Sequence, residues 1–363
     1  MSYGRFRIQK ADVDKETRII AVSDVHGTVD YLEGILKKVN YTPKDILVIV
    51  GDLIEKGPDS LKTVRLVQKL MEESSQVYLT QGNVDYDRVG QFWEEGQQAD
   101  YDFDGMLHWS KKVWGGSLFQ DMMEEMGIDL EEVNGENICA VKKQIKENYS
   151  RELALFEDLP TILEIGNYIF VHAGIPTDDL EKLKEEDLFS YLKRDAFLKE
   201  NVTFKKNVVV GHWPVCLYRD DVDSMNPIFD YEKHVVAIDG GCALKNGAQI
   251  NALVLANAWV DLKEAMCVAY DDLPVIRANR TQAGKERTIT IRFFDFKVEL
   301  LEKWSDVARV RHVSTGKEFV VPWSYLYSCN NGLYNCSDFS DAWLQVTEGD
   351  ELKVVQERRK DIL

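Results

Sequence analysis

The sequence lacks the features that would place it in a membrane or an oxidising compartment. No apolar run approaches the ~20 residues that a membrane helix needs, and residues 1–17 are polar, without the hydrophobic region of a signal peptide. The six cysteines form no CxxC pair and no zinc-ribbon spacing. We therefore expect a cytoplasmic protein with reduced thiols. The alternative is that Cys329 and Cys336 approach each other around the intervening Asn-Asn-Gly turn.

Positive charge is also scarce. The chain has 44 Lys and Arg against 62 Asp and Glu, which gives a net charge of −18, nearly all of it in the first 281 residues. Phosphate repulsion would oppose the binding of duplex nucleic acid, so we do not expect that partner. Small anions remain open as ligands, because a local metal pair can reverse the sign of the field.

Six short polar motifs are present, and an apolar run typical of a buried strand precedes nearly every one. The runs cover residues 18–22, 46–50, 76–79, 168–171, 208–210 and 235–238. The motifs are Ser23-Asp24-Val25-His26-Gly27, Gly51-Asp52, Gly82-Asn83-Val84-Asp85, Val171-His172-Ala173-Gly174, Gly211-His212-Trp213-Pro214 and Ile238-Asp239-Gly240-Gly241. Each polar residue would lie at the carboxyl end of a strand, where α/β sheets place their sites.

In this order the motifs resemble those of the calcineurin-like metallophosphoesterases, and within them the phosphoprotein phosphatase branch. Bacterial members of that branch include Ser/Thr phosphatases and diadenosine tetraphosphatases. Residues 192–197, with Arg194, resemble the family's WxRDxF segment, and the whole resemblance covers roughly residues 17–260. It implies an α/β fold of the metallophosphoesterase type, a two-sheet sandwich flanked by helices.

The resemblance also implies a dinuclear metal centre. Asp24, His26 and Asp52 would hold the first divalent ion, Asp52 would bridge, and Asn83, His172 and His212 would complete the second. Carboxylate, amide and imidazole ligands suit manganese first, and also iron, zinc or nickel. A metal-bridging hydroxide would attack phosphorus in line.

Arg194 and Asp239 are two further candidate residues of the site. Arg194 would hold two phosphate oxygens in a fork; an exposed helix arginine is the alternative. Asp239 follows a strand and precedes two glycines, and we interpret it as a turn residue that supports the site, not as a ligand.

The chain departs from the family's pattern around the acid site. The family's second motif ends Asp-Arg-Gly, where this chain has Glu55-Lys56-Gly57, and its third motif has a histidine where this chain has Val84. In the family that histidine protonates the leaving group, and its loss typically costs about 10²–10⁴ in rate. Lys56 keeps the positive charge of the arginine but not its bidentate fork.

Two hypotheses follow from this departure. In the first, the chain is a phosphohydrolase for substrates with good leaving groups, such as nucleotide anhydrides, with His108 as a candidate replacement acid. In the second, it is a catalytically weak pseudophosphatase that binds metal and phosphate as a scaffold. Retention of every metal ligand favours the enzyme, whose substrate would be a phosphorylated small molecule, a nucleotide or a phosphoprotein.

The sequence predicts three parts. Residues 1–270 form the metallophosphoesterase domain, with a helical insertion at about 86–158 that is either a cap over the site or a peripheral decoration. Residues 271–286 are polar and indicate a linker. Short strands with turn signals in 287–363 predict a small β-barrel, SH3-like, whose aromatic residues either pack its core or form a groove for a peptide partner.

Overall fold

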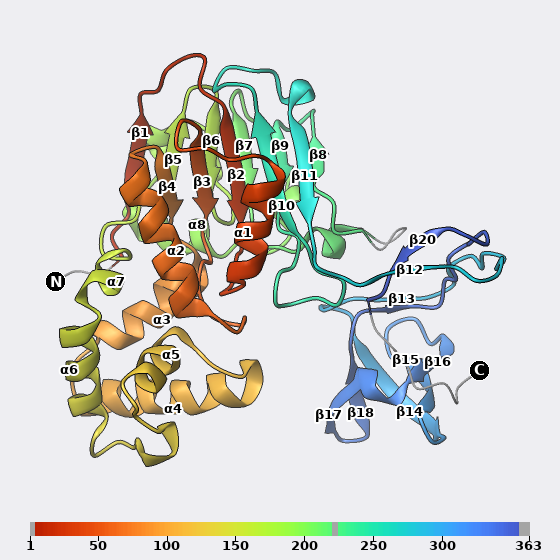
Figure 1. Ribbon diagram of the computed structural model, residues 1–363. Coiled ribbons are helices and arrows are strands. Elements are labelled where there is room, and N and C mark those ends of the chain that lie inside the picture. Colours follow the sequence, from red (N-terminus) through yellow and green to blue (C-terminus); the bar gives the residue numbers. More distant parts are fainter. Residues whose placement is uncertain (1–3, 220–223, 356–363) are drawn as a thin grey trace. The chain divides into compact units, whose positions relative to one another are not determined.

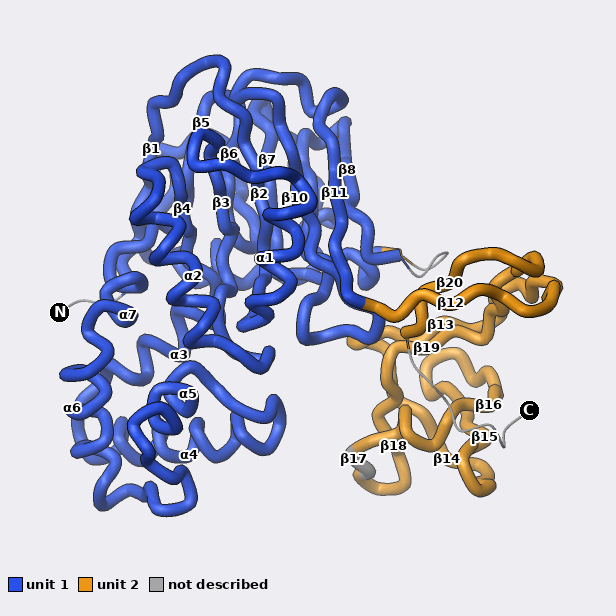
Figure 2. The backbone as a smooth tube through the Cα atoms, viewed as in Figure 1, with its two compact units in different colours: residues 1–218, 224–272 blue, residues 219–223, 273–363 orange. Residues whose placement is uncertain are grey.

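The computed structural model describes residues 4–219 and 224–355, apart from the side chains of Ser328 and Cys329. The chain divides into two compact units (Figure 2). Unit 1 contains the described residues up to 218 and 224–272, and unit 2 contains the described residues from 273 onward together with Arg219. The boundary between Asp272 and Leu273 lies at the start of the expected linker.

Unit 1 contains two β-sheets (Figure 1). One has six strands in the order β1-β5-β6-β7-β9-β8, and the other has five in the order β11-β10-β2-β3-β4. Their bounds are β1 Ile8–Ala11, β2 Ile19–Ser23, β3 Ile46–Val50, β4 Val77–Thr80, β5 Ile162–Ile165, β6 Tyr168–Val171, β7 Asn207–Val210, β8 Ile228–Asp230, β9 Val235–Ala237, β10 Ile250–Leu255 and β11 Met266–Tyr270. The predicted α/β two-sheet architecture is confirmed. Beyond the six apolar runs that precede the motifs, the sheets contain β1, β5, β8, β10 and β11.

The strands that precede the motifs are apolar throughout because both of their faces are buried. In β2, Ile19 and Ala21 join the hydrophobic cluster between the two sheets. Ile20 and Val22 point the other way and join the cluster that faces the helices. The two-residue period of a strand thus divides one apolar run between two cores.

The face of the five-stranded sheet opposite the six-stranded sheet is covered by helices α1 (Val29–Lys38) and α2 (Ser60–Glu73) (Figure 1). The apolar residues of both helices recur at helical spacing, and most of them are buried: Leu32, Ile35, Leu36, Val64, Val67 and Leu70. Leu66 is only partly buried. The motif strands β2, β3 and β4 run parallel, as do β6, β7 and β9. Their carboxyl ends therefore lie at one edge of each sheet.

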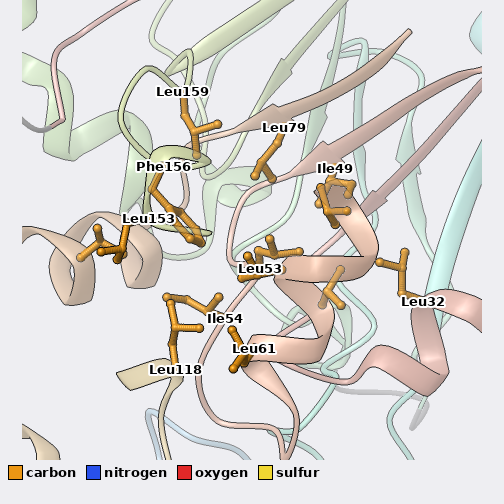
Figure 3. Close-up of a cluster of buried hydrophobic side chains, with 14 of the residues drawn as sticks. Leu32, Ile49, Leu53, Ile54, Leu61, Leu79, Leu118, Leu153, Phe156 and Leu159 are labelled. Atoms are coloured by element: carbon orange, nitrogen blue, oxygen red, sulfur yellow. The ribbon is translucent and has the colours of Figure 1, made fainter. Parts of the chain in front are cut away.

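The helical insertion consists of five helices: α3 (Asn83–Trp93), α4 (Gln97–Trp114), α5 (Leu118–Glu125), α6 (Ile138–Asn148) and α7 (Ser150–Ala154), with the 3-10 turn η1 (Leu130–Glu132). Its buried side chains belong to the same cluster as Leu53, Ile54 and Leu61 of the sheet domain, and Leu118, Leu153 and Phe156 lie beside these residues in Figure 3. The helical insertion therefore shares one continuous hydrophobic core with the sheets and helices of the rest of unit 1.

The remaining short elements of unit 1 lie between its later strands. They are η2 (Leu180–Lys182), η3 (Glu185–Asp187), α8 (Leu188–Leu192), η4 (Phe197–Lys199), η5 (Val215–Tyr218) and η6 (Leu262–Glu264).

Within the described part of the chain, no helix is both long and apolar enough to span a membrane. Cys139, Cys216, Cys242, Cys267 and Cys336 are free thiols; the side chain of Cys329 lies outside the described residues.

Unit 2 contains a five-stranded antiparallel sheet in the order β16-β15-β14-β18-β17 and two two-stranded sheets, β12-β20 and β13-β19. The bounds are β12 Val275–Arg277, β13 Thr290–Ile291, β14 Lys297–Lys303, β15 Val307–His312, β16 Glu318–Pro322, β17 Leu326–Asn330, β18 Leu333–Cys336, β19 Phe339–Ser340 and β20 Glu351–Lys353, with η7 at Trp323–Tyr325. An SH3-like identity stays a prediction.

Two expectations about unit 2 need adjustment. The expected linker contains β12, which pairs with β20, so part of that segment is ordered by the backbone of unit 2. The aromatic residues divide between the two alternatives: Trp323 and Tyr325 pack against the core, whereas Trp304 and Trp343 are exposed.

Candidate metal centre

The predicted ligands come together at the carboxyl ends of the motif strands. Asp24 follows β2, Asp52 follows β3 and Asn83 begins α3 after β4, while His172 and His212 follow β6 and β7 of the other sheet. One side-chain atom from each of Asp24, Asp52 and His172 lies within 4.8 Å of the others, and all three residues are buried. The structure therefore brings these three predicted ligands, which follow strands of both sheets, to one place.

The two carboxylate oxygens of Asp52 face different groups. Its Oδ2 lies 3.6 Å from His26 Nε2, which is also 4.0 Å from an oxygen of Asp24. Its Oδ1 lies 3.4 Å from His172 Nε2, and that nitrogen is 3.1 Å from Asn83 Oδ1. Asp52 thus stands between two sets of donor atoms.

Backbone carbonyls orient two of the imidazoles. His26 Nδ1 lies 3.2 Å from the carbonyl oxygen of Ile54, and His172 Nδ1 lies 3.1 Å from that of Val50. In the neutral form of such a ring, donation from Nδ1 to a carbonyl leaves Nε2 without a proton and available as a ligand. In both residues Nε2 is the atom that faces Asp52.

His212 is oriented differently, by a carboxylate that the sequence argument missed. Its Nε2 lies 2.9 Å from Asp195 Oδ1, and its Nδ1 lies 2.9 Å from Asn83 Oδ1. The His212 backbone N–H also donates to both oxygens of Asp24, at 3.1 and 3.0 Å. Asp195 follows Arg194 directly in the sequence, and the motif drew attention to the arginine alone.

The backbone around the centre is strained. Asp24, His26, Asp52 and His212 have φ angles of 50°, 49°, 48° and 65°, in the left-handed region that non-glycine residues seldom occupy. Such strain costs about 1–3 kcal/mol per residue and clusters at functional sites. The turns that aim the ligands are thus maintained by the surrounding fold against local preference.

Close packing also excludes side chains next to the carboxylates. A Cβ on Gly211 would lie 2.1 Å from Asp24 Oδ2, and a Cβ on Gly82 would lie 2.2 Å from Asp52 Oδ1. Both glycines are therefore required by space, since any larger residue would displace a predicted ligand.

Buried charge shapes the ionisation of the carboxylates. Burial raises the pKa of Asp24 well above its usual range, and the charge of Asp239 raises it further. Burial also opposes the ionisation of Asp52, but the charge of His172 and its hydrogen bond outweigh burial and hold the pKa of Asp52 below its usual range. Burial lowers the pKa of His172 too, but Asp52 and Asp24 outweigh it and raise that pKa to about 10.

The pKa values of the other two imidazoles, His26 and His212, are lowered. Burial, together with the charge of Lys56, lowers the pKa of His26 to about 3. Burial and the charge of His172 lower the pKa of His212 to about 4. Both rings are therefore neutral at physiological pH, the form that binds metals.

Asp239 adds a third buried carboxylate beside Asp24. One of its oxygens accepts a hydrogen bond from the Gly241 N–H at 2.7 Å, and the other, Oδ2, is buried without a partner. Burial raises the pKa of Asp239 to about 6. Three buried carboxylates, one with an oxygen that lacks a partner, lie with imidazoles and an amide oxygen in a donor set that fits divalent cations. The role of Asp239 as a turn residue that supports the site, and not as a ligand, stays a prediction.

Lys56 lies at the centre, and Glu55 points away from it. The ammonium Nζ of Lys56 is 3.1 Å from His26 Nε2. The Glu55 carboxylate is fully buried and accepts a hydrogen bond from the Leu118 N–H, the first residue of α5, at 2.9 Å. Burial raises the pKa of Glu55 to about 7. Adjacent residues of one turn thus serve the metal centre and the helical insertion.

Arg194 is engaged locally. Its Nε and Nη2 donate to the two oxygens of Glu200 at 2.7 and 2.6 Å, in the bidentate fork that the sequence analysis assigned to phosphate. The guanidinium also lies 5.6 Å from the ring centre of Phe197. Phosphate binding by Arg194 stays a prediction, and it requires the release of Glu200.

Val84, at the position of the family's acid, and His108, the candidate replacement acid, lie on different helices. Val84 is buried, and its backbone N–H donates to Asp52 Oδ1 at 2.9 Å, so the first turn of α3 stabilises that carboxylate. His108 is exposed on α4, and its Nδ1 lies 3.3 Å from Asp104 Oδ1. His108 therefore interacts along its own helix.

Comparison with known proteins identifies the family. The model of the calcineurin-like phosphoesterases matches residues 17–237. The chain belongs to this family. It is accordingly a phosphoester-hydrolysing enzyme of the metallophosphoesterase class, and the family implies divalent metal ions as cofactors.

Two curated relatives and one solved structure illustrate the range of similar proteins. The chain is 26% identical over 220 residues to the asymmetrical bis(5'-nucleosyl)-tetraphosphatase PrpE of Bacillus subtilis. This match covers 53% of this chain and 78% of the relative. It is 23% identical over 268 residues to the symmetrical bis(5'-nucleosyl)-tetraphosphatase of Wigglesworthia glossinidia brevipalpis, covering 62% and 91%. A protein serine/threonine phosphatase from Saccharomyces cerevisiae aligns with a TM-score of 0.41 at 13% identity, covering 74% of this chain and 84% of that one.

Proposed function

We propose that this chain is a dinuclear metal-dependent phosphohydrolase that cleaves a phosphoanhydride bond in a nucleotide with two or more phosphates. The position of Asp52 carries the proposal. Its two oxygens face two separate donor sets, one with His26 and Asp24 and one with His172 and Asn83. A carboxylate so placed is suited to bridging two ions.

In this proposal Asp24, His26 and Asp52 hold one ion, and Asp52, Asn83, His172 and His212 hold the other. The oxygen and imidazole donors favour manganese, iron, zinc or nickel. The two ions would supply Lewis-acid activation of a water and of the phosphoryl oxygens. The chain supplies orientation: carbonyls of Val50 and Ile54 and the Asp195 carboxylate hold the three imidazoles.

Two cationic side chains would bind the substrate phosphates. Lys56 offers an ammonium at the edge of the donor set, 3.1 Å from His26 Nε2. Arg194 offers a guanidinium fork if an incoming phosphate displaces Glu200. Breaking that ion pair lowers the net gain from the arginine, so substrate binding would depend on Lys56 more than on Arg194.

The residue after Asn83 favours an anhydride over an alkyl phosphate ester. Val84 cannot donate a proton, and a phosphate leaving group needs little protonation, whereas a serine alkoxide needs a positioned acid. The similar proteins named as bis(5'-nucleosyl)-tetraphosphatases support a nucleotide substrate. We therefore rank dinucleoside polyphosphates ahead of phosphoproteins.

A pseudophosphatase is the second candidate. It is favoured by the pairing of Arg194 with Glu200, which withdraws a phosphate-binding group, together with the aliphatic residue at position 84. This candidate predicts bound metal without turnover.

Parallel assays of the Mn²⁺-loaded protein test the proposal, with p-nitrophenyl phosphate, diadenosine tetraphosphate and a phosphothreonine peptide as substrates. We expect turnover of the first two, slow or absent turnover of the peptide, and loss of both activity and metal content in Asp52→Asn. Intact activity in that variant would refute the site. Bound metal without turnover in the unchanged protein would favour the pseudophosphatase.

A further variant separates the roles of the two cations. Glu200→Gln should free the Arg194 fork and lower KM for the nucleotide, with little change in kcat. An unchanged KM would mean that Arg194 does not contact the substrate.

A further inference from the structure

Three side chains of the helical insertion form a mixed cationic and aromatic cluster. The Arg88 guanidinium, from α3, lies 5.5 Å from the ring centre of Trp109 and 5.2 Å from that of Trp114, both from α4. The two indole rings meet edge to face, with centres 4.7 Å apart. We call Arg88, Trp109 and Trp114 the indole cluster.

Helix α3 connects the indole cluster to the metal centre. Arg88 follows the predicted ligand Asn83 by five residues on the same helix, a rise of about 7.5 Å. Its positive charge acts on the buried Glu55 carboxyl, on the turn after Asp52, and opposes the rise in the pKa of that group. A nucleotide with its phosphates at the metal ligands has its base within reach of such a position.

The cluster combines a fixed cation with an open aromatic surface. The Arg88 side chain is only 14% exposed and pairs with Asp87 at 3.1 Å, and its Nε is buried without a partner. Trp109, by contrast, is 45% exposed. Burial of the arginine holds the indoles in place, so the exposed part of Trp109 is a rigid, flat surface.

Such a surface suits a nucleobase. Bases stack on aromatic side chains irrespective of sequence, because every base has a π-face, and a nearby guanidinium adds a cation–π contribution. The exposed face of Trp109 is open to such a ligand. A small aryl or alkyl phosphate would not reach this surface.

We propose that the indole cluster is the nucleobase-binding subsite of this enzyme, with the exposed face of Trp109 stacking on the base of a nucleotide whose phosphates lie at the metal centre. The inference rests on the proposed function, since it takes a nucleotide as the substrate. It assigns base recognition to the helical insertion, which would then act in substrate selection.

Binding of a matched ligand pair tests the subsite without turnover. Calorimetry would compare α,β-methylene-ADP with methylenebisphosphonate on the Mn²⁺-loaded protein, because the two share the non-hydrolysable diphosphate and differ in the nucleoside. In Trp109→Ala we expect about a five- to hundredfold loss of affinity for the nucleotide, and no change for the bisphosphonate. Trp109→Phe keeps an aromatic face and should retain most of the affinity.

Trp259→Ala is the matched control. Trp259 is also an exposed tryptophan of unit 1, at 40%, with the Lys15 ammonium 5.8 Å from its ring centre. It follows β10, whose last residue, Leu255, pairs antiparallel with Ile19 at the start of β2. Trp259 therefore lies at the edge of the sheet opposite the metal centre, and its loss should change neither affinity.

The outcomes separate this inference from the proposed function. Equal affinities of the unchanged protein for the two ligands, an unaltered nucleotide affinity in Trp109→Ala, or equal losses for both ligands would each overturn the subsite. Absence of diadenosine tetraphosphate hydrolysis, with a Trp109-dependent preference for the nucleotide ligand, would refute the proposed reaction and retain the subsite.

Discussion

Replacement of Glu55 by glutamine tests how a buried acid links the metal-binding turn to the helical insertion. Glu55 is fully buried; one of its oxygens accepts the Leu118 N–H, and the other is buried without a partner. The charges that face it are Arg88 and Asp85 on α3 and Asp121 on α5. Burial dominates and raises the pKa of Glu55 from its ordinary 4.5 to about 7.

The sign of the pH dependence follows from the raised pKa. Between about pH 4.5 and pH 7 the folded protein holds a proton on Glu55 that the unfolded chain has released, so folding stability falls as pH rises through this range. The difference between the two pKa values corresponds to at most ~3 kcal/mol. Glutamine does not titrate, so the variant should lose this part of the slope and gain stability relative to the unchanged protein at high pH.

The assay is urea unfolding of the chelator-treated proteins at several values between about pH 5 and pH 8, followed by the helical circular dichroism signal. All α-helices of the described residues belong to unit 1, so this signal reports on the unit that contains Glu55. Asp85 and Asp121 are present in both proteins, so only the part of their titration that depends on the charge of Glu55 remains in the difference. Glu131→Gln, at an exposed position, controls for the change in net charge.

The difference in unfolding free energy between Glu55→Gln and the unchanged protein should therefore grow with pH by up to ~3 kcal/mol. A difference that is constant across this range would show that Glu55 is ionised in the folded protein, and would refute the assignment of burial as the dominant effect.

Three further predictions address the metal centre. Gly211→Ala would place a Cβ 2.1 Å from Asp24 Oδ2, so we expect a destabilisation of about 1–3 kcal/mol and a lower metal content, measured by thermal unfolding and elemental analysis; an unchanged metal content would contradict the close packing. Asp195→Asn weakens the support of His212 and should reduce Mn²⁺ affinity by roughly tenfold, near the lower end of such effects because Asp195 is half exposed; equal affinity would show that this hydrogen bond is dispensable. Val84→His should raise turnover of phosphoserine peptides, by up to about 10²–10⁴, if the missing acid limits that reaction; a rate at or below that of the unchanged protein would argue against this explanation.

Local patterns were sufficient for much of the sheet domain. A run such as Ile46–Val50 is apolar on both faces, and only a strand covered on both sides needs that pattern. The apolar residues of α1 and α2 likewise recur with the helical period, and the buried ones face the core. Local patterns give less where strands are short: β13 has only two residues, Thr290–Ile291, and β14 begins at Lys297.

The sequence by itself determined which polar residues follow the buried strands, and its resemblance to the family implied that Asp24, Asp52, Asn83, His172 and His212 would share one site. The packing of one sheet on the other decided that the two groups of strand ends meet. Tertiary structure alone decided what each of the remaining polar groups faces. Glu200 pairs with Arg194, Asp195 turns toward His212, and Glu55 turns away from the metals toward Leu118. Hydrophobic periodicity records which face of an element is buried, whereas these contacts depend on how loops and helices from different parts of the chain are packed together.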